Sequence, residues 1–159
     1  MDEAIRAEII NLREALDDGE MYVGPPATMA DIASLTSAVW VEMAAKLPVE
    51  YLDFLENFDG LVACGVFIYS SHTRVRANGK LARYDFMRMN RLGRELGFMD
   101  NFLVFGDSDL DEYVLDLSRG KYQVRDRQAF DNVFEEFETF DGLLGHMVDL
   151  IVHWSKNQS

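Results

Sequence analysis

Several residue types that would define a class of protein are scarce in this sequence. Cys64 is the only cysteine, which excludes an intrachain disulfide framework and a zinc site built from four cysteines. No run of about 18 apolar residues occurs, so no membrane-spanning helix is expected. The first residues, 1–4, lack the basic start and apolar stretch of a secretory signal. We therefore expect a soluble, cytoplasmic protein.

Positive charge is also scarce in this chain. Its 159 residues include 15 Lys and Arg against 28 Asp and Glu, which gives a formal net charge of −13. This balance argues against general nucleic-acid binding, because contacts to phosphate need a cationic surface. It is consistent with a basic protein partner that is attracted over long range. The alternative is that the acidic surface only keeps the protein soluble.

The positive charge that is present is concentrated in one segment. Residues 72–97 hold seven basic and two acidic side chains, whereas the parts of the chain on either side are strongly acidic. The segment could bind an anion or RNA, but the surrounding negative charge opposes attraction to phosphate. We expect its arginines either to pair with the protein's own carboxylates or to form half of a partner interface. The basic residues are Arg74, Arg76, Lys80, Arg83, Arg88, Arg91 and Arg94.

The residues that are abundant predict a folded α+β protein. Hydrophobic residues make up 48% of the chain, which is enough for the core of one domain. Helical and alternating apolar spacings predict an antiparallel sheet of about four to six strands packed with helices, with N-terminal helices and a C-terminal helix. The expected helices cover 2–16, 28–47, 48–58 and 85–96 and one that begins at Thr139, and the expected strands lie within 61–69, 102–126 and 133–137.

An acid-rich turn near the middle of the predicted strands is the first candidate site. Alternating oxygen ligands can bind calcium, but the calcium loop needs Gly at its sixth position and Glu at its twelfth. Counted from Asp107, those positions hold Glu112 and Ser118, so no metal is expected there. We predict that the turn is an acidic surface that binds a protein partner, with a merely solvated hairpin as the alternative. The predicted partner-binding residues are Asp107, Asp109, Asp111, Glu112 and Asp116.

Histidines on the predicted C-terminal helix form the second candidate. His146, Asp149 and His153 are three and seven residues apart, which places them on one helical face. Zinc binds such ligands, but no further protein ligand is assured, and we interpret the three residues as an exposed polar face. We therefore expect no metal and no cofactor at this helix.

Nucleophiles are the third candidate, and the sequence gives them little support. Cys64 lies in an apolar run that suggests a core position, and His72 is the nearest histidine in sequence. The Ser70-Ser71-His72 stretch is not part of a Gly-x-Ser-x-Gly elbow, and both glycine-rich phosphate-binding motifs are absent. We expect no catalytic residues and no enzymatic activity.

Three stretches share their order and spacing with one known family. The first, in 47–60, is a Leu-Pro pair followed by Tyr, Phe-Leu and a turn with Gly. The second, in 102–116, is a strand that ends in Phe-Gly, an acidic turn and a second strand. The third, in 134–144, is a strand followed by a helix that starts with Phe and Leu-Leu. Together they resemble the SUKH superfamily, which contains the yeast cell-wall-assembly regulator and many bacterial toxin-immunity proteins, and most of all its YrhA-like subgroup. Asp59 stands where Asn is usual, and Asp111-Glu112 stands where Gly-Asp is frequent.

The resemblance implies a domain over residues 28–154 and a function in binding. Residues 1–27 fall outside it and are expected to form a helical extension packed on the domain. Bacterial members of the family are thought to neutralise a cognate toxin, often a nuclease or deaminase, in the cytoplasm of the producing cell. An acidic inhibitor could occupy the basic cleft of such a toxin as a phosphate mimic. A small metal-dependent hydrolase and an RNA- or anion-binding regulatory protein are the alternatives.

Overall fold

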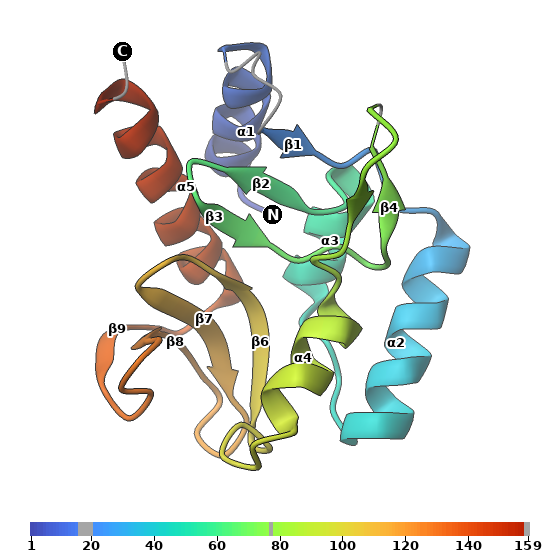
Figure 1. Cartoon of the computed structure of the whole chain (residues 1–159), viewed down its shortest axis with the longest axis vertical. Helices are drawn as coiled ribbons and strands as arrows, with labels where there is room; N and C mark the ends of the chain where they lie inside the picture. The colour runs from blue at the N-terminus through green and yellow to red at the C-terminus, as the bar shows by residue number, and fades with distance from the viewer. Residues whose placement is uncertain (16–20, 77, 158–159) are drawn as a thin grey trace.

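The computed structural model describes residues 1–15, 21–76 and 78–157. The predicted α+β class is confirmed, with helices and antiparallel strands in the expected order (Figure 1). Leu16 and the turn expected at Asp17–Gly19 lie outside the described residues. The helices are α1 (Glu3–Ala15), α2 (Met29–Met43), α3 (Val49–Asn57), α4 (Phe86–Arg94) and α5 (Phe140–Asn157). The strands are β1 (Tyr22–Val23), β2 (Leu61–Ala63), β3 (Val66–Ile68), β4 (Arg74–Val75), β5 (Leu81–Ala82), β6 (Phe102–Asp107), β7 (Asp111–Asp116), β8 (Lys121–Asp126) and β9 (Val133–Phe137).

The main sheet has seven strands in the order β1-β2-β3-β6-β7-β8-β9, and each neighbouring pair is antiparallel. It is larger than the expected four to six strands. Residues 61–69 form the hairpin of β2 and β3, because Cys64 and Gly65 turn the chain with φ angles of 51° and 76°. The strands expected within 102–126 are confirmed as β6, β7 and β8, which form an antiparallel meander, and β9 follows at the edge.

One face of the sheet is covered by helices α1, α3 and α5 (Figure 1). Aromatic rings fill the space between them and the strands. Phe105 of β6 lies 4.9 Å from the ring of Tyr51 in α3 and 5.2 Å from that of Phe140 in α5. All three side chains are fully buried, and each is worth roughly 1.5–3 kcal/mol of burial free energy. None of the described helices has the length and apolar character needed to cross a bilayer.

Helix α4 lies beside β6 where the pairing with β3 ends. The side-chain amide of Asn90 donates to the carbonyl oxygen of Val104 and accepts from its N–H, each at 2.8 Å. These two bonds replace the strand partner that β6 lacks at this point, since β3 pairs only with Gly106 and Asp107. The register between β6 and β7 also shifts here, between Val104 and Gly106. Asn90 therefore fixes α4 beside β6 and satisfies a buried backbone segment.

Candidate functional site

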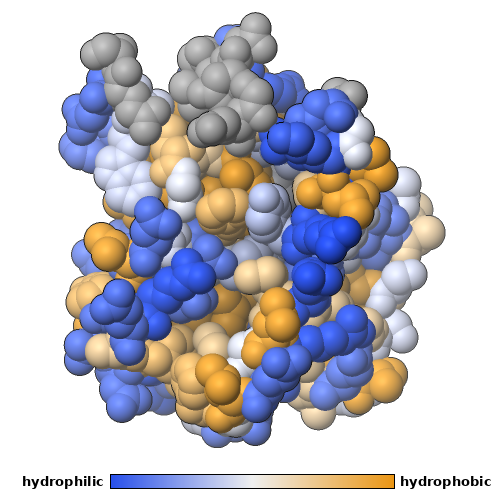
Figure 2. Space-filling model, viewed as in Figure 1, coloured by the Kyte–Doolittle hydropathy of each residue, from blue (hydrophilic) through white to orange (hydrophobic). Residues whose placement is uncertain are grey.

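The second face of the sheet has no covering helix layer. Cross-strand partners project to the same side of a sheet, so the pairings define one row of side chains across six strands. This row is apolar over β1 to β3 and charged over β6 to β8. Figure 2 views this side and shows apolar side chains in a hollow over β2 and β3, with hydrophilic side chains on both flanks. The row consists of Tyr22, Val62, Phe67, Asp107, Glu112 and Arg125.

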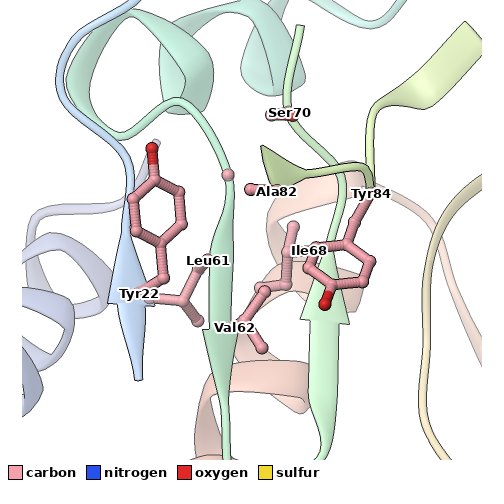
Figure 3. A pocket seen from close by; sticks show the side chains of 8 residues that line it. Tyr22, Leu61, Val62, Ile68, Ser70, Ala82 and Tyr84 are labelled. Atoms are coloured by element: carbon pink, nitrogen blue, oxygen red, sulfur yellow. The ribbon is translucent and has the colours of Figure 1, made fainter. Parts of the chain in front are cut away.

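The apolar half of the row is shaped by two tyrosines. Tyr84 lies against Phe67 with ring centroids 4.7 Å apart, and Tyr22 lies on the other side of Val62 (Figure 3). The hollow between the tyrosines has a volume of about 10 Å³, enough for roughly one water molecule. Pockets that bind small molecules are some tens of times larger. This half suits an apolar side chain laid across the sheet better than a small-molecule substrate.

The charged half, called the acidic half below, contains two carboxyl groups that face each other. It also holds Arg125, the cross-strand partner of Glu112, whose guanidinium lies 3.7 Å from Asp116. The hydroxyl of Tyr69 donates to Asp107, and the guanidinium of Arg127 lies 3.7 Å from Asp107 Oδ1 and 3.9 Å from Glu112 Oε1. Burial, followed by the charge of Asp107, raises the pKa of Glu112 to about 7, although Arg127 opposes the shift. Burial also raises the pKa of the Asp107 carboxyl. A further cation brought to this point would stabilise both ionised carboxylates.

The structure separates the five predicted partner-binding residues into two groups. Asp107, Asp109, Asp111 and Glu112 lie at one end of the β6–β7 pair, but Asp111 projects to the helix-covered face, since neighbouring strand residues alternate. Asp109 is exposed, and burial raises the pKa of the half-buried Asp111. Asp116 lies at the other end of β7 and is buried. Its Oδ1 accepts from the N–H groups of the following turn at 3.0 and 3.3 Å, which gives it a structural role there.

Sequence reasoning missed Asp126, which pairs with Asp111 on the helix-covered face of the sheet, opposite to the face of Glu112. It is the cross-strand partner of Asp111, at the last position of β8. Its carboxylate accepts from the N–H of Gln128 at 2.9 Å, and this hydrogen bond lowers its pKa. A count of strand lengths could have found the pair, because Asp111 begins β7, Asp126 ends β8, and the two strands are of equal length and joined by a short turn.

Comparisons with known proteins do not identify a family for this chain. No family model matches the chain, and no curated protein matches it. The resemblance to the SUKH superfamily therefore stays a prediction.

A second polar cluster surrounds Asp59, at the turn after α3. The fully buried carboxylate accepts from the Ser71 N–H at 2.6 Å, from Ser71 Oγ at 2.8 Å, and from Nε and Nη2 of Arg74, both at 2.6 Å. His72 Nδ1 lies 2.9 Å from Ser71 Oγ and 3.6 Å from the carboxylate of Asp31. The sequence indicated Asp59 only as a turn residue.

This cluster brings together the Ser71 and His72 pair that the sequence singled out, but its chemistry is that of a structural anchor. Across the described ranges, Asp31, Asp59 and His72 are the one group whose possible ligand atoms lie within 4.8 Å of one another. Arg74 occupies the position that a cation would take, because its guanidinium binds Asp59 directly. Arg74 also starts β4, so the contact ties the β4–β5 hairpin to the end of α3.

The histidines of α5 are not brought into a metal cluster within the described residues. His146 packs against the rings of Tyr113 and Phe137, with centroids 6.1 and 5.8 Å away. His153 is exposed, and its Nε2 lies 3.2 Å from the side-chain amide of Asn157. Asp149 is exposed as well. The expected exposed polar face holds for His153 and Asp149, whereas His146 is half-buried against Tyr113 and Phe137.

Cys64 does not occupy the core position that its apolar neighbours suggested. It is half-buried and lies in the β2–β3 turn, because the apolar run is interrupted there by Gly65.

Several arginines of the basic segment are engaged within the molecule. Arg91 forms a two-point contact with Glu42 of α2, at 2.9 and 2.6 Å. Arg76 lies over the ring of Tyr22, 5.3 Å from its centroid, and Arg94 donates to the carbonyl oxygen of Phe102 at 2.9 Å. Internal pairing, one of the two expectations for this segment, holds for Arg91 and for Arg74.

Proposed function

We propose that this chain is a bacterial immunity-type protein, which binds a cognate toxin acting on nucleic acid and blocks it. The observation that carries the proposal is the sheet face without a helix layer, where an apolar half adjoins an acidic half whose Asp107 is buried and whose Glu112 side chain is 17% exposed. The nearby Arg127 lies close to Asp107 and Glu112, and both carboxyl groups still have raised pKa values. The site thus favours additional positive charge from outside.

The two halves supply different parts of the binding free energy. Burial of the apolar side chains around Val62 and Phe67 would contribute affinity, at about 25 cal/mol per Å² removed from water. The carboxylates would contribute attraction at long range and selection for a cationic surface. A toxin that cleaves or modifies nucleic acid carries such a surface where it contacts phosphate. The resemblance to the SUKH superfamily supports the same function, which would be exercised in the cytoplasm.

The proposal is tested by recovering the partner from native cells with tagged wild-type protein and two variants. Glu112→Lys reverses the charge inside the acidic half, and Asp149→Lys makes the same change on the exposed face of α5. We expect one basic protein to be retained by the wild type and by Asp149→Lys, and to be lost with Glu112→Lys.

The recovered protein is then measured directly. Its association rate should fall steeply with added salt, because screening removes long-range attraction. Co-expression should also relieve the toxicity of that protein. Equal retention by Glu112→Lys, or a partner that is not toxic, would overturn the proposal.

The two alternatives predict other observations. A metal-dependent hydrolase should show a melting temperature that falls with a chelator. An RNA- or anion-binding protein should lose its ligand when Arg88, Arg91 and Arg94 are replaced by Glu. Since Arg91 already binds Glu42, the contacts of the described residues do not favour the second alternative.

A further inference from the structure

Helix α2 is apolar on a side that nothing in the described structure covers. Of its 15 residues, Leu35 and Val39 are buried, whereas Met29, Trp40 and Val41 are 90%, 57% and 77% exposed. The helix lies at the edge of the molecule and contacts α3 and α4 on its inner side (Figure 1). Large exposed apolar groups on one element mark an interaction surface. The remaining exposed residues on this outer side are Ala30, Ala33, Ser34, Thr36 and Ser37.

The outer side of α2 is also electrically neutral. The helix carries two charged side chains, and both are engaged within the molecule. Asp31 accepts from the Thr28 N–H at 2.9 Å in a capping box, and Glu42 binds Arg91. In a chain with a net charge of −13, a second copy can approach this side without meeting an unpaired carboxylate of α2 itself, although Glu56 of α3 borders the groove. A basic partner gains no attraction here, and among neutral surfaces the side-chain sizes along the helix suit a second copy of the same chain.

The sizes of the side chains suit a symmetric contact. Exposed small residues, Ala33 and Ser37, lie one turn apart near the middle of the helix. The larger Met29 lies at one end and Val41 at the other. In an antiparallel arrangement centred at Leu35, Ala33 meets Ser37 of the other copy, and Met29 meets Val41. Small residues at the crossing allow the helices to approach closely, and the larger ones pack at both ends.

We propose that α2 is the contact surface of a symmetric dimer, in which the outer sides of two α2 helices pack antiparallel. A two-fold axis passes near the middle of the helix pair, so the same patch is used on both subunits. Glu56 of α3 borders the groove beside Met29 and Trp40 and limits how far the contact spreads toward α3. The dimer is expected to be weak, because one 15-residue helix from each subunit makes a small contact. Contacts that bury less than about 1,200 Å² belong to the transient class. The proposal does not depend on the proposed function, and the acidic end of the sheet lies on other elements.

The first experiment is sedimentation equilibrium of the full chain up to about 500 µM, a range that detects a weak dimer. Wild-type protein should dimerise with concentration. Ser37→Glu places a charge at the crossing of the helices and should weaken the dimer at least about tenfold. Val49→Glu is the matched control, because Val49 is 80% exposed on α3 and should tolerate the change. A monomeric wild type, or equal weakening by both variants, overturns the proposal.

The second experiment tests the register independently of any weakening. In a Cys64→Ser background, a chain with Ala33→Cys is mixed with a differently tagged chain with Ser37→Cys and oxidised. The mixed disulfide should form faster than either symmetric one, because only facing positions bring the Cα atoms within about 7 Å. Cross-linking at equal rates in all combinations overturns the antiparallel arrangement.

The dependence on salt concentration distinguishes this dimer from the binding of a basic toxin. Added salt screens the repulsion between two acidic chains and should strengthen the dimer, whereas the same addition weakens binding to a basic toxin. A dimer that weakens with salt rules out the neutral contact proposed here, whatever the outcome of the partner experiments.

Discussion

Glu112 lies directly opposite Asp107 across the β6–β7 pair, and the guanidinium of Arg127 lies within 4 Å of a carboxylate oxygen of each. Two carboxyl groups this close, and largely removed from water, disfavour each other's ionised form. The two carboxyl groups therefore resist ionisation in the isolated protein, and a cationic partner would favour their ionised forms. The ionisation of this pair therefore couples the pH dependence of stability to the binding of a cationic partner.

The first prediction concerns stability and pH. The folded-state pKa of Glu112, about 7, lies above the ordinary value of 4.5, so the native state binds more protons than the unfolded state between these values. The free energy of unfolding should therefore fall as pH rises from about 4.5 to 7, by up to roughly 2–3 kcal/mol from this group. Asp107, whose pKa is also raised, adds to the same trend.

Urea unfolding of wild type and Glu112→Gln at pH 5 and pH 8 measures the effect. The variant should lose much of the pH dependence and should be the more stable protein at pH 8, since its side chain stays neutral. Asp149→Asn, at an exposed carboxyl of α5, is the control and should keep the wild-type dependence. Identical pH dependence in Glu112→Gln and wild type would contradict the prediction.

The second prediction concerns the anchor between Asp59 and Arg74. Asp59→Ala leaves the guanidinium of Arg74, which is 17% exposed, without its main partner. Loss of one partner of a buried ion pair costs about 3–5 kcal/mol, so the variant should unfold in much less denaturant. Arg91→Ala breaks the exposed pair with Glu42 and should cost less than about 1 kcal/mol. Similar losses in the two variants would show that Asp59 is not the anchor of the β4–β5 hairpin.

The third prediction concerns the contact between Asn90 and Val104. Asn90→Ala removes both hydrogen bonds to the buried backbone of β6 and should lower the free energy of unfolding by about 2–4 kcal/mol. Arg88→Ala, an exposed change on the same helix, should cost less than about 0.5 kcal/mol. Hydrogen exchange of the Val104 amide should accelerate in the first variant alone. Unchanged exchange would mean that another group satisfies this N–H.

The sequence predicted much of the fold because its signals are local. Apolar spacing located the helices and the strands within 102–126, and the helix expected from residue 28 onward is α2, which Thr28 caps. The split of residues 61–69 was missed because it depends on the positive φ of Cys64, which apolar content does not reveal. The pairing of β1 with β2 joins distant segments and has no local signal.

The candidate site was predicted only in part, for the same reason. The acidic turn was correctly placed between two strands, but its sequence could not show that Asp107 is buried against Tyr69 while Asp109 stays exposed. The apolar half of the site was not anticipated. It arises because Val62 and Phe67 fall in register with Asp107 across β2, β3 and β6, and register between distant strands is a tertiary property.

The cross-strand row fixes the distance between its apolar and acidic halves. Val62 and Glu112 are separated by three strand spacings, from β2 through β3 and β6 to β7, or about 14 Å. Backbone hydrogen bonds along the sheet hold this interval, so the face itself cannot adapt to a different spacing. Any protein that uses both halves must present an apolar group and a cation at that separation, and it can vary freely elsewhere.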